Sequence, residues 1–221
     1  RPRDAMLTQA EDLRPAVARC RRMLDLDADP VAIDAHLAES PQLAASVAAH
    51  PGRRVPRTVD GPEFAIRAIL GQQISTARAA ALGARLVQRC GDPLPAPSGS
   101  LTHLFPSPDT IAGLHHAEFP MPRSRARAIL AVAGALAAGD VDLSPGADRT
   151  AARTALAAIP GIGPWTVEVI AMRALGDPDA FPATDLGVIR GAHALGIDNP
   201  ARAAEAWRPW RAYAGQHLWA A

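Results

Sequence analysis

One aspartate and two tryptophans are the side chains of this sequence best suited to chemistry. Asp185 follows Thr184 and precedes a helix-favouring segment, Leu186 to Leu195. A carboxylate there could stabilise positive charge that develops on a reacting group and could orient a water molecule. Its alternative role is to cap that helix, a contribution of about 1 kcal/mol. The indoles of Trp165 and Trp219 could attract a flat cationic ring by stacking and cation–π interaction, or could simply fill a core.

The segment Leu156 to Ile170, which contains Trp165, predicts two helices joined by a glycine hairpin. Gly161 and Gly163 permit tight backbone geometry, and Pro164 suits the first turn of a helix. Backbone N–H groups at such a turn can bind a phosphate oxygen at the positive end of the second helix. Proline and glycine are also ordinary in loops. Because Trp165 and Asp185 follow this segment at specific distances along the sequence, we favour a phosphate-binding hairpin over an ordinary loop.

With these features the chain resembles the helix-hairpin-helix DNA glycosylases, and within them the DNA-3-methyladenine glycosylase II (AlkA) type. Two further segments carry the resemblance, Phe64 to Ser75 and Trp207 to Trp219, so that it covers nearly the whole chain. It implies that Asp185 is the catalytic carboxylate. It also implies a base pocket, for which the matching positions are Trp165, Trp219, Val169 and Leu186. Relatives often have aromatic residues at the last two positions, so we expect a roomier pocket. Trp207 and Trp210 are expected to be structural.

The resemblance also implies how DNA is held. Pro160, Gly161, Ile162 and Gly163 would form the DNA-binding hairpin, and Gln72 with Gln73 would fill the space that a flipped base leaves in the duplex. Relatives often place an apolar residue at the position of Gln73. The carbonyls of Ala157, Ile159 and Ile162 match those that hold a structural Na or K ion when DNA is bound. No cofactor is expected to be required.

Every one of the 23 basic residues is arginine. Glycosylases of this superfamily that also cleave the strand attack the sugar with a lysine amine, and Trp165 stands where that lysine would be. We therefore expect no lyase activity. Glu168, on the helix after the hairpin, is expected to be an exposed residue favoured by the helix dipole, without a catalytic role. Cys20 and Cys90 are too few for a four-cysteine iron–sulfur cluster and are expected to be free thiols. No zinc site is predicted.

Charge and composition permit this interpretation without requiring it. The net charge is +1 and the apolar content is 48%. Arginines are concentrated in residues 51–91 and 123–127, which suits phosphate contact or a solvated helix face. Acidic residues between 25 and 39, Asp25 among them, are the counterweight. With no apolar run of about 20 residues and no leader, we expect no membrane contact and a cytoplasmic, DNA-associated bacterial protein.

Helical periodicity broken by proline and glycine predicts an all-α, two-lobed helical bundle in one module, residues 1–221, with the active cleft between the lobes. The central bundle is expected at about 62–176 and the second lobe at 1–61 plus 177–221. Residues 93–100 are predicted to be a flexible loop. The β-rich domain that usually precedes this module in AlkA relatives is expected to be missing or trimmed. We expect a monomer that is either a piece of a larger repair protein or a member of a lineage that dispenses with that domain.

The function expected from the resemblance is hydrolysis of the N-glycosidic bond of alkylated purines, such as 3-methyladenine and 7-methylguanine. The base would be flipped out of double-stranded DNA containing alkylated bases, and an abasic site would remain. One alternative is a noncatalytic DNA-binding module in which Asp185 only caps a helix and the tryptophans belong to the core. Another is a glycosylase for oxidised purine or mismatched adenine.

Overall fold

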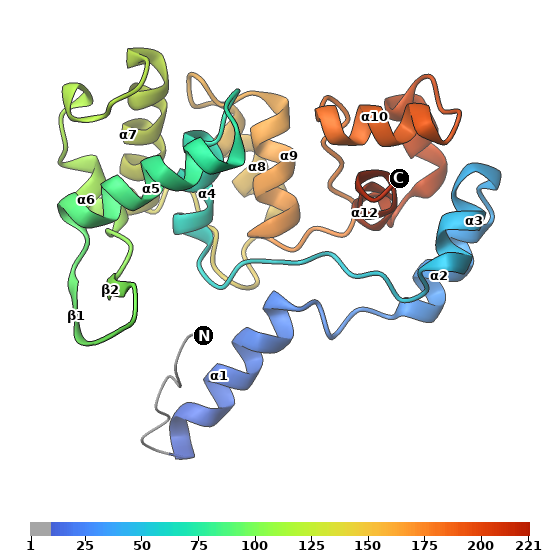
Figure 1. Cartoon of the computed structure of the whole chain (residues 1–221), viewed down its shortest axis with the longest axis horizontal. Helices are drawn as coiled ribbons and strands as arrows, with labels where there is room; N and C mark the ends of the chain where they lie inside the picture. Colours follow the sequence, from blue (N-terminus) through green and yellow to red (C-terminus); the bar gives the residue numbers. More distant parts are fainter. Residues whose placement is uncertain (1–9) are drawn as a thin grey trace. The chain divides into compact units, whose positions relative to one another are not determined.

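The computed structural model describes residues 10–221 and is helical apart from one small β-hairpin in that range (Figure 1). The all-α prediction is therefore confirmed. The described residues form two compact units. Unit 1 contains residues 10–18 and 60–163, and unit 2 contains residues 19–59 and 164–221. Helix α1 (Ala10–Met23) contributes residues to both.

Unit 1 is a helical bundle in which α4 and α6 pack against α7. Buried aliphatic residues of α4, among them Ile66 and Ile69, and of α7, among them Ile129 and Val132, contribute to its core. Gly139 ends α7 in the left-handed conformation, with φ of 80°. The elements of unit 1 are α4 (Gly61–Leu70), α5 (Thr76–Cys90), β1 (Pro93–Ser98), β2 (Leu101–His103), α6 (Pro108–Ala112), η1 (His116–Glu118), α7 (Arg123–Ala138) and α8 (Arg149–Ala157).

The prediction of a flexible loop at residues 93–100 is wrong, because β1 and β2 pair there as an antiparallel hairpin. Gly99 supplies the positive φ of 60° for the turn. Both strands of a two-stranded sheet are edge strands, where prolines are tolerated because each strand has one side without a partner. The three prolines of β1 are therefore compatible with a strand, although in the sequence so many prolines argue against one.

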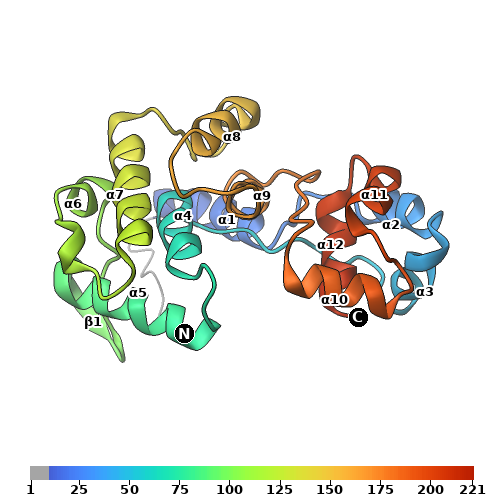
Figure 2. The ribbon, with the colours of Figure 1, turned by 90° about the horizontal axis from the view of Figure 1, so that it is seen from above.

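Unit 2 joins a stretch near the start of the chain to its last quarter, residues 164–221. Helix α10 lies against α12 in both views (Figures 1 and 2). This contact is close because Gly191 of α10 has no side chain: a Cβ there would stand 1.7 Å from the Leu218 carbonyl oxygen. The elements of unit 2 are α2 (Pro30–Ala38), α3 (Pro41–Ala49), α9 (Pro164–Arg173), α10 (Leu186–Ala194), α11 (Pro200–Ala203), η2 (Ala204–Trp207) and α12 (Arg211–Trp219).

The division between the units falls directly after the hairpin, at 163, and not at 176 as the sequence suggested. The reason is the packing of α9. Its fully buried Ala171 and Met172 belong to the same core cluster as Trp207 and Tyr213. The structure also assigns residues 10–18 to unit 1, where the sequence suggested the second lobe.

Asp25 is a buried residue of unit 2 and not part of an acidic surface, since it is only 2% exposed. Its carboxylate accepts a hydrogen bond from the Tyr213 hydroxyl at 2.7 Å and another from the Val55 N–H at 3.2 Å. It also pairs with the Arg57 guanidinium at 2.6 Å. Asp25 therefore joins three separate stretches of unit 2, including α12, which ends at Trp219.

Candidate active site

Asp185 caps α10, which is one of the roles that the sequence predicts for it. Its Oδ1 accepts hydrogen bonds from the backbone N–H groups of Gly187 at 2.8 Å and Val188 at 3.1 Å. The backbone of Asp185 is extended, with φ of −68° and ψ of 132°, as an N-cap residue requires. The side chain is half-buried. The cap therefore fixes the direction of the carboxylate at the positive end of the helix.

Both predicted pocket tryptophans donate their indole N–H groups to this same carboxylate. Trp165 Nε1 lies 2.9 Å from Asp185 Oδ2, and Trp219 Nε1 lies 2.7 Å from Oδ1. Trp165 is in the first turn of α9, and Trp219 is the last residue of α12. Three elements of unit 2 therefore bring together the three residues that the sequence singled out.

These contacts determine the protonation state of Asp185. Partial burial raises the pKa of its carboxyl group, but the hydrogen bonds from Trp219, Trp165 and the two backbone N–H groups outweigh burial. The pKa of Asp185 is therefore below its ordinary value. At neutral pH the site holds a carboxylate, which is the form that can stabilise adjacent positive charge.

Gly187 allows Trp219 to approach the start of α10, and sequence reasoning missed it. A Cβ at Gly187 would lie 2.7 Å from Cδ1 of Trp219 and 3.0 Å from Oδ1 of Asp185. Both distances are too short for a side chain to be added without displacing the pair. The one signal in the sequence was a glycine two residues after a capping aspartate. A glycine at such a position does not by itself indicate a close contact.

The two other predicted pocket positions differ in exposure. Val169, four residues after Trp165 on α9, is half-buried, whereas Leu186 is 66% exposed. Trp207 is a core residue, 2% exposed, with its ring 5.9 Å from that of Phe181. Trp210 packs edge-on against Tyr213. The structural roles expected for these two tryptophans agree with this packing.

Glu168 is not the exposed residue that we expected. It is half-buried, and its Oε2 accepts a hydrogen bond of 2.8 Å from the backbone N–H of Phe181. The acceptor is needed because Phe181 lies in the irregular segment between α9 and α10, where no neighbouring strand or helix satisfies its N–H. Glu168 thus contacts the segment that leads to Asp185.

The predicted glycine hairpin follows α8 directly and belongs to unit 1. Gly161 has φ of 91°, and the N–H of Ile162 donates to the carbonyl of Ile159 at 3.1 Å, closing the turn. Ile162 is buried, while Pro160, Gly161 and Gly163 are exposed. A Cβ at Gly161 would lie 2.9 Å from the Cβ of Ala128 on α7, so the hairpin packs closely on that helix.

The two glutamines between α4 and α5 have different surroundings. The side-chain amide of Gln72 donates to the carbonyl of Gly161 at 3.3 Å, so this residue contacts the hairpin. Gln73 is exposed and has a positive φ of 55°. That conformation is uncommon for a residue other than glycine and presents its side chain from a tight bend. Of the two candidates, Gln73 is the one on an exposed turn.

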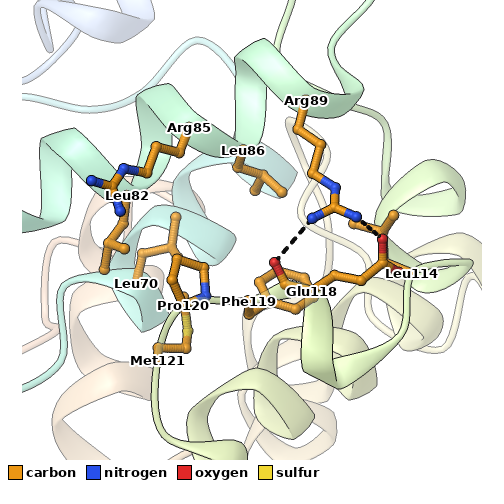
Figure 3. Close-up of a pocket in the computed structure, with 10 residues that line it drawn as sticks. All are labelled: Leu70, Leu82, Arg85, Leu86, Arg89, Leu114, Glu118, Phe119, Pro120 and Met121. Atoms are coloured by element: carbon orange, nitrogen blue, oxygen red, sulfur yellow. Dashed lines mark hydrogen bonds and ion pairs between the residues drawn. The ribbon is translucent and has the colours of Figure 1, made fainter.

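An apolar hollow of about 270 Å³ lies in unit 1 between α5 and the segment around η1 (Figure 3). Two of its lining residues, Arg89 and Glu118, form an ion pair. Neither Asp185 nor any other predicted pocket residue lines it, so it is separate from the candidate site. The lining residues are Leu70, Leu82, Arg85, Leu86, Arg89, Leu114, Glu118, Phe119, Pro120 and Met121.

Within residues 10–221, no helix has the length and apolar character needed to cross a membrane. In the same range no group of three or more His, Cys, Asp or Glu side chains is placed to hold a metal ion. Cys20 and Cys90 are free, as predicted. Burial raises the pKa of the Cys90 thiol.

The glycine hairpin and the aspartate that follows it are consistent with the protein family that the sequence matches. Residues 66–211 match the HhH-GPD superfamily of base excision DNA repair proteins, and the chain belongs to that superfamily. Residues 4–60 match the AlkA N-terminal domain, which places the chain in the AlkA type. We expected that domain to be missing or trimmed, but residues 4–60 match it. Their described portion, 10–60, is helical and contains no strand.

Two curated relatives are similar over nearly the whole chain. The probable bifunctional transcriptional activator/DNA repair enzyme AlkA of Mycobacterium tuberculosis is 50% identical over 218 residues, which cover 97% of this chain and 44% of the relative. DNA-3-methyladenine glycosylase 2 of Escherichia coli is 33% identical over 94% of this chain and 73% of its own length. The chain thus spans less than half of the mycobacterial relative.

The fold is shared with a solved 8-oxoguanine glycosylase/lyase from Clostridium acetobutylicum in complex with double-stranded DNA. The TM-score is 0.75, with 20% identity over 90% of this chain and 71% of that protein. At this identity the likeness concerns the fold alone. It therefore decides neither the lesion nor whether strand cleavage follows.

Proposed function

We propose that this chain is a DNA glycosylase of base excision repair that hydrolyses the N-glycosidic bond of alkylated purines and leaves an abasic site. One observation carries the proposal: Asp185, half-buried at the start of α10, receives the indole N–H groups of both Trp165 and Trp219. An ionised carboxylate and two aromatic rings then share one site. The similarity to DNA-3-methyladenine glycosylase 2 of E. coli supports the choice of lesion.

The chemistry follows from the charges involved. Alkylation at N3 or N7 makes a purine cationic and a better leaving group. As the N-glycosidic bond lengthens, positive charge develops on the sugar, and a preorganised carboxylate stabilises that charge. The lowered pKa of Asp185 keeps it ionised for this role. The electrons of the broken bond leave with the cationic base, which becomes neutral, while water adds to the sugar carbon and releases one proton to solvent.

The tryptophans provide the surroundings for a base that has left the stack. Flipping costs a few kcal/mol, and a damaged base reduces that cost. The N–H donation to Asp185 fixes one edge of each indole, so the ring orientation is set before the base arrives. Exposed Gln73, on its tight bend, is our candidate for the residue that enters the duplex, and its amide could hydrogen-bond the unpaired base.

DNA would be held without regard to sequence by the hairpin at residues 160–163. Exposed Gly161 and Gly163 leave the backbone accessible to a phosphate. The carbonyls of Ala157, Ile159 and Ile162 suit a monovalent cation, because residues 157–163 contain no carboxylate and would supply only neutral oxygen ligands. Such an ion would contribute positive charge beside the phosphate. The remaining lone pair of the Ile159 carbonyl is available, since the other accepts the Ile162 N–H.

We further propose that base release is not followed by strand cleavage. The chain has no lysine side chain to form a Schiff base with the sugar. At the second position after the hairpin, where a lyase would need its amine, Trp165 donates to Asp185 instead. The product would be an intact strand that breaks only on alkaline treatment.

The test is single-turnover base release from duplex DNA containing 7-methylguanine, comparing the parent with Asp185→Asn. Asparagine keeps the size and the capping oxygen but removes the charge, so we expect a loss of roughly 10² to 10³ in rate. Asp198→Asn is the matched control, because Asp198 is an exposed residue of the same unit. Samples are analysed with and without alkali, which also tests for lyase activity.

Other outcomes identify the alternatives. DNA binding without base release from methylated purines, together with release from 8-oxoguanine or mismatched adenine substrates, would assign a different lesion. Binding without release from any of these substrates would support a noncatalytic module. Equal rates for the parent and Asp185→Asn would remove Asp185 from the mechanism.

A further inference from the structure

Helix α9 contacts the segment that carries Asp185 at two points. Trp165, in its first turn, donates its indole N–H to the Asp185 carboxylate at 2.9 Å. Glu168 accepts the backbone N–H of Phe181 at 2.8 Å. Residues 165 and 168 are three apart and therefore neighbours on one helical face. A single face of α9 thus holds both ends of the segment from Phe181 to Asp185.

The segment between these points is itself constrained. The N–H of Ala183 donates to the Phe181 carbonyl at 2.9 Å, and the N–H of Asp185 donates to the Pro182 carbonyl at 2.8 Å. Phe181 is 6% exposed and packs edge-on against Trp207. Because its internal hydrogen bonds make this short segment stiff, a displacement at Phe181 would be transmitted to Asp185.

We propose that Glu168 is a positioning residue that sets the place of the Asp185 carboxylate relative to Trp165. Glu168 itself does not touch the reacting atoms. It acts through the Phe181 N–H, which it holds with a half-buried carboxylate oxygen. This inference rests on the function proposed above. It predicts that an acceptor oxygen at residue 168 is required.

The kinetic test compares Glu168→Ala, Glu168→Gln and the control Glu39→Gln in single-turnover release of 7-methylguanine. Glu39 is an exposed residue of unit 2. We expect Glu168→Ala to lose roughly ten- to hundredfold in rate, as for a misplaced catalytic group. We expect its binding to DNA with an abasic-site analogue to stay within about twofold. Glu168→Gln retains an acceptor oxygen and should keep most of the rate.

A spectroscopic readout tests the geometry independently of activity. The indole N–H signal of Trp165, assigned with Trp165→Phe in ¹H–¹⁵N spectra, reports on its hydrogen bond to Asp185. We expect this signal to move in Glu168→Ala and to stay in place in Glu39→Gln. If Glu168 contributed only to stability, Glu168→Ala would lower the melting temperature. It would not reduce the rate while leaving DNA binding intact, and it would not move this signal.

The outcomes separate this inference from the proposed function. If the parent releases no base, the proposed function fails, and the indole signal alone decides whether Glu168 positions Asp185. If the parent is active, an unchanged rate and an unmoved signal in folded Glu168→Ala overturn the inference. Should Glu168→Ala not fold, Glu168→Gln decides: near-parental rate supports the inference, and a loss as large as that of Asp185→Asn overturns it.

Discussion

At the scale of single residues, the carboxylate of Asp185 combines two kinds of contact, a helix cap and hydrogen bonds from the two pocket tryptophans. It caps α10 through two backbone N–H groups, and it receives two indole N–H groups. The cap aims the side chain, and the indoles lower its pKa and fix its rotation. One residue can therefore complete the helix and also form the centre of the proposed active site.

We predict that Trp219→Phe shifts the pH dependence of base release. Phenylalanine keeps an aromatic ring but removes one donor to Asp185, so the pKa of that carboxyl group rises toward its ordinary value. Because the proposed reaction needs the ionised form, the rate should begin to fall at a higher pH in the variant than in the parent. Single-turnover rates measured at decreasing pH check this.

The folding stability should depend on pH in the same direction as the rate of base release. A carboxyl group with a lowered pKa in the folded state stabilises the protein above its unfolded pKa, about 3.9, and loses that contribution as the pH falls through the folded value. The variant should lose it at a higher pH than the parent. Acid limbs that coincide for the two proteins would mean that the Trp219 hydrogen bond does not control Asp185.

Sequence analysis identified Asp185 and Trp165 because each stands at a recognisable spacing from the hairpin, and Trp219 because its position matches the family resemblance. It misjudged Glu168 and assigned no structural role to Asp25, since nothing in the local sequence distinguishes a glutamate that accepts a distant backbone N–H from one in water. The buried state of Asp25 likewise depends on Tyr213, which is 188 residues away. Local patterns indicate helix caps well and long-range hydrogen bonds poorly.

At the scale of elements, two glycines of α10 determine how this helix meets its neighbours. Gly187 leaves room for the Trp219 indole, and Gly191 leaves room for the carbonyl of Leu218. They are four residues apart and therefore lie on one face of α10. Because neither glycine has a side chain, the end of α12 can approach the N-terminus of α10 closely.

We predict that Gly191→Ala lowers the free energy of unfolding by about 3 kcal/mol or more, because its methyl group would collide with backbone that cannot rotate away. Gly134→Ala is the matched control. Gly134 lies inside α7 with no atom within 4 Å of an added Cβ, so alanine should stabilise the helix by about 0.5–1 kcal/mol. Urea unfolding of both variants checks the pair, and two changes of the same sign would contradict the packing described here.

Element boundaries were largely predictable from prolines and capping residues. Proline stands in the first turn of α2, α3, α4, α6 and α11, and at the first position of α9. The unit to which α9 belongs was not predictable in this way. That assignment depends on which core receives its buried face, and a helix with apolar residues on several sides does not reveal its partner.

At the scale of the whole molecule, unit 2 depends on contacts between the early stretch 19–59 and the last quarter of the chain, 164–221. The buried Asp25 connects the two through Arg57, Val55 and Tyr213. Burial, followed by the nearby Asp25 carboxylate, raises the pKa of the Tyr213 hydroxyl, so this group stays a hydrogen-bond donor in the neutral and mildly alkaline range.

We predict that Asp25→Asn lowers the free energy of unfolding by about 3–5 kcal/mol, since it leaves Arg57 beside a neutral partner in a buried network. Asp27→Asn is the control. Asp27 pairs with Arg21 at the surface, where its side chain is 67% exposed, and its loss should cost less than about 1 kcal/mol. Denaturant unfolding followed by tryptophan fluorescence measures both. Equal effects would show that Asp25 does not hold unit 2 together.

The close packing of Gly161 on Ala128 has a consequence for how related sequences can change. An added Cβ at 161 would lie 2.9 Å from that of Ala128, so neither position can gain volume while the hairpin keeps its distance from α7. Substitutions at the two positions should therefore be correlated across the family. A hairpin transplanted from a relative should keep its geometry only if the matching segment of α7 is transplanted with it.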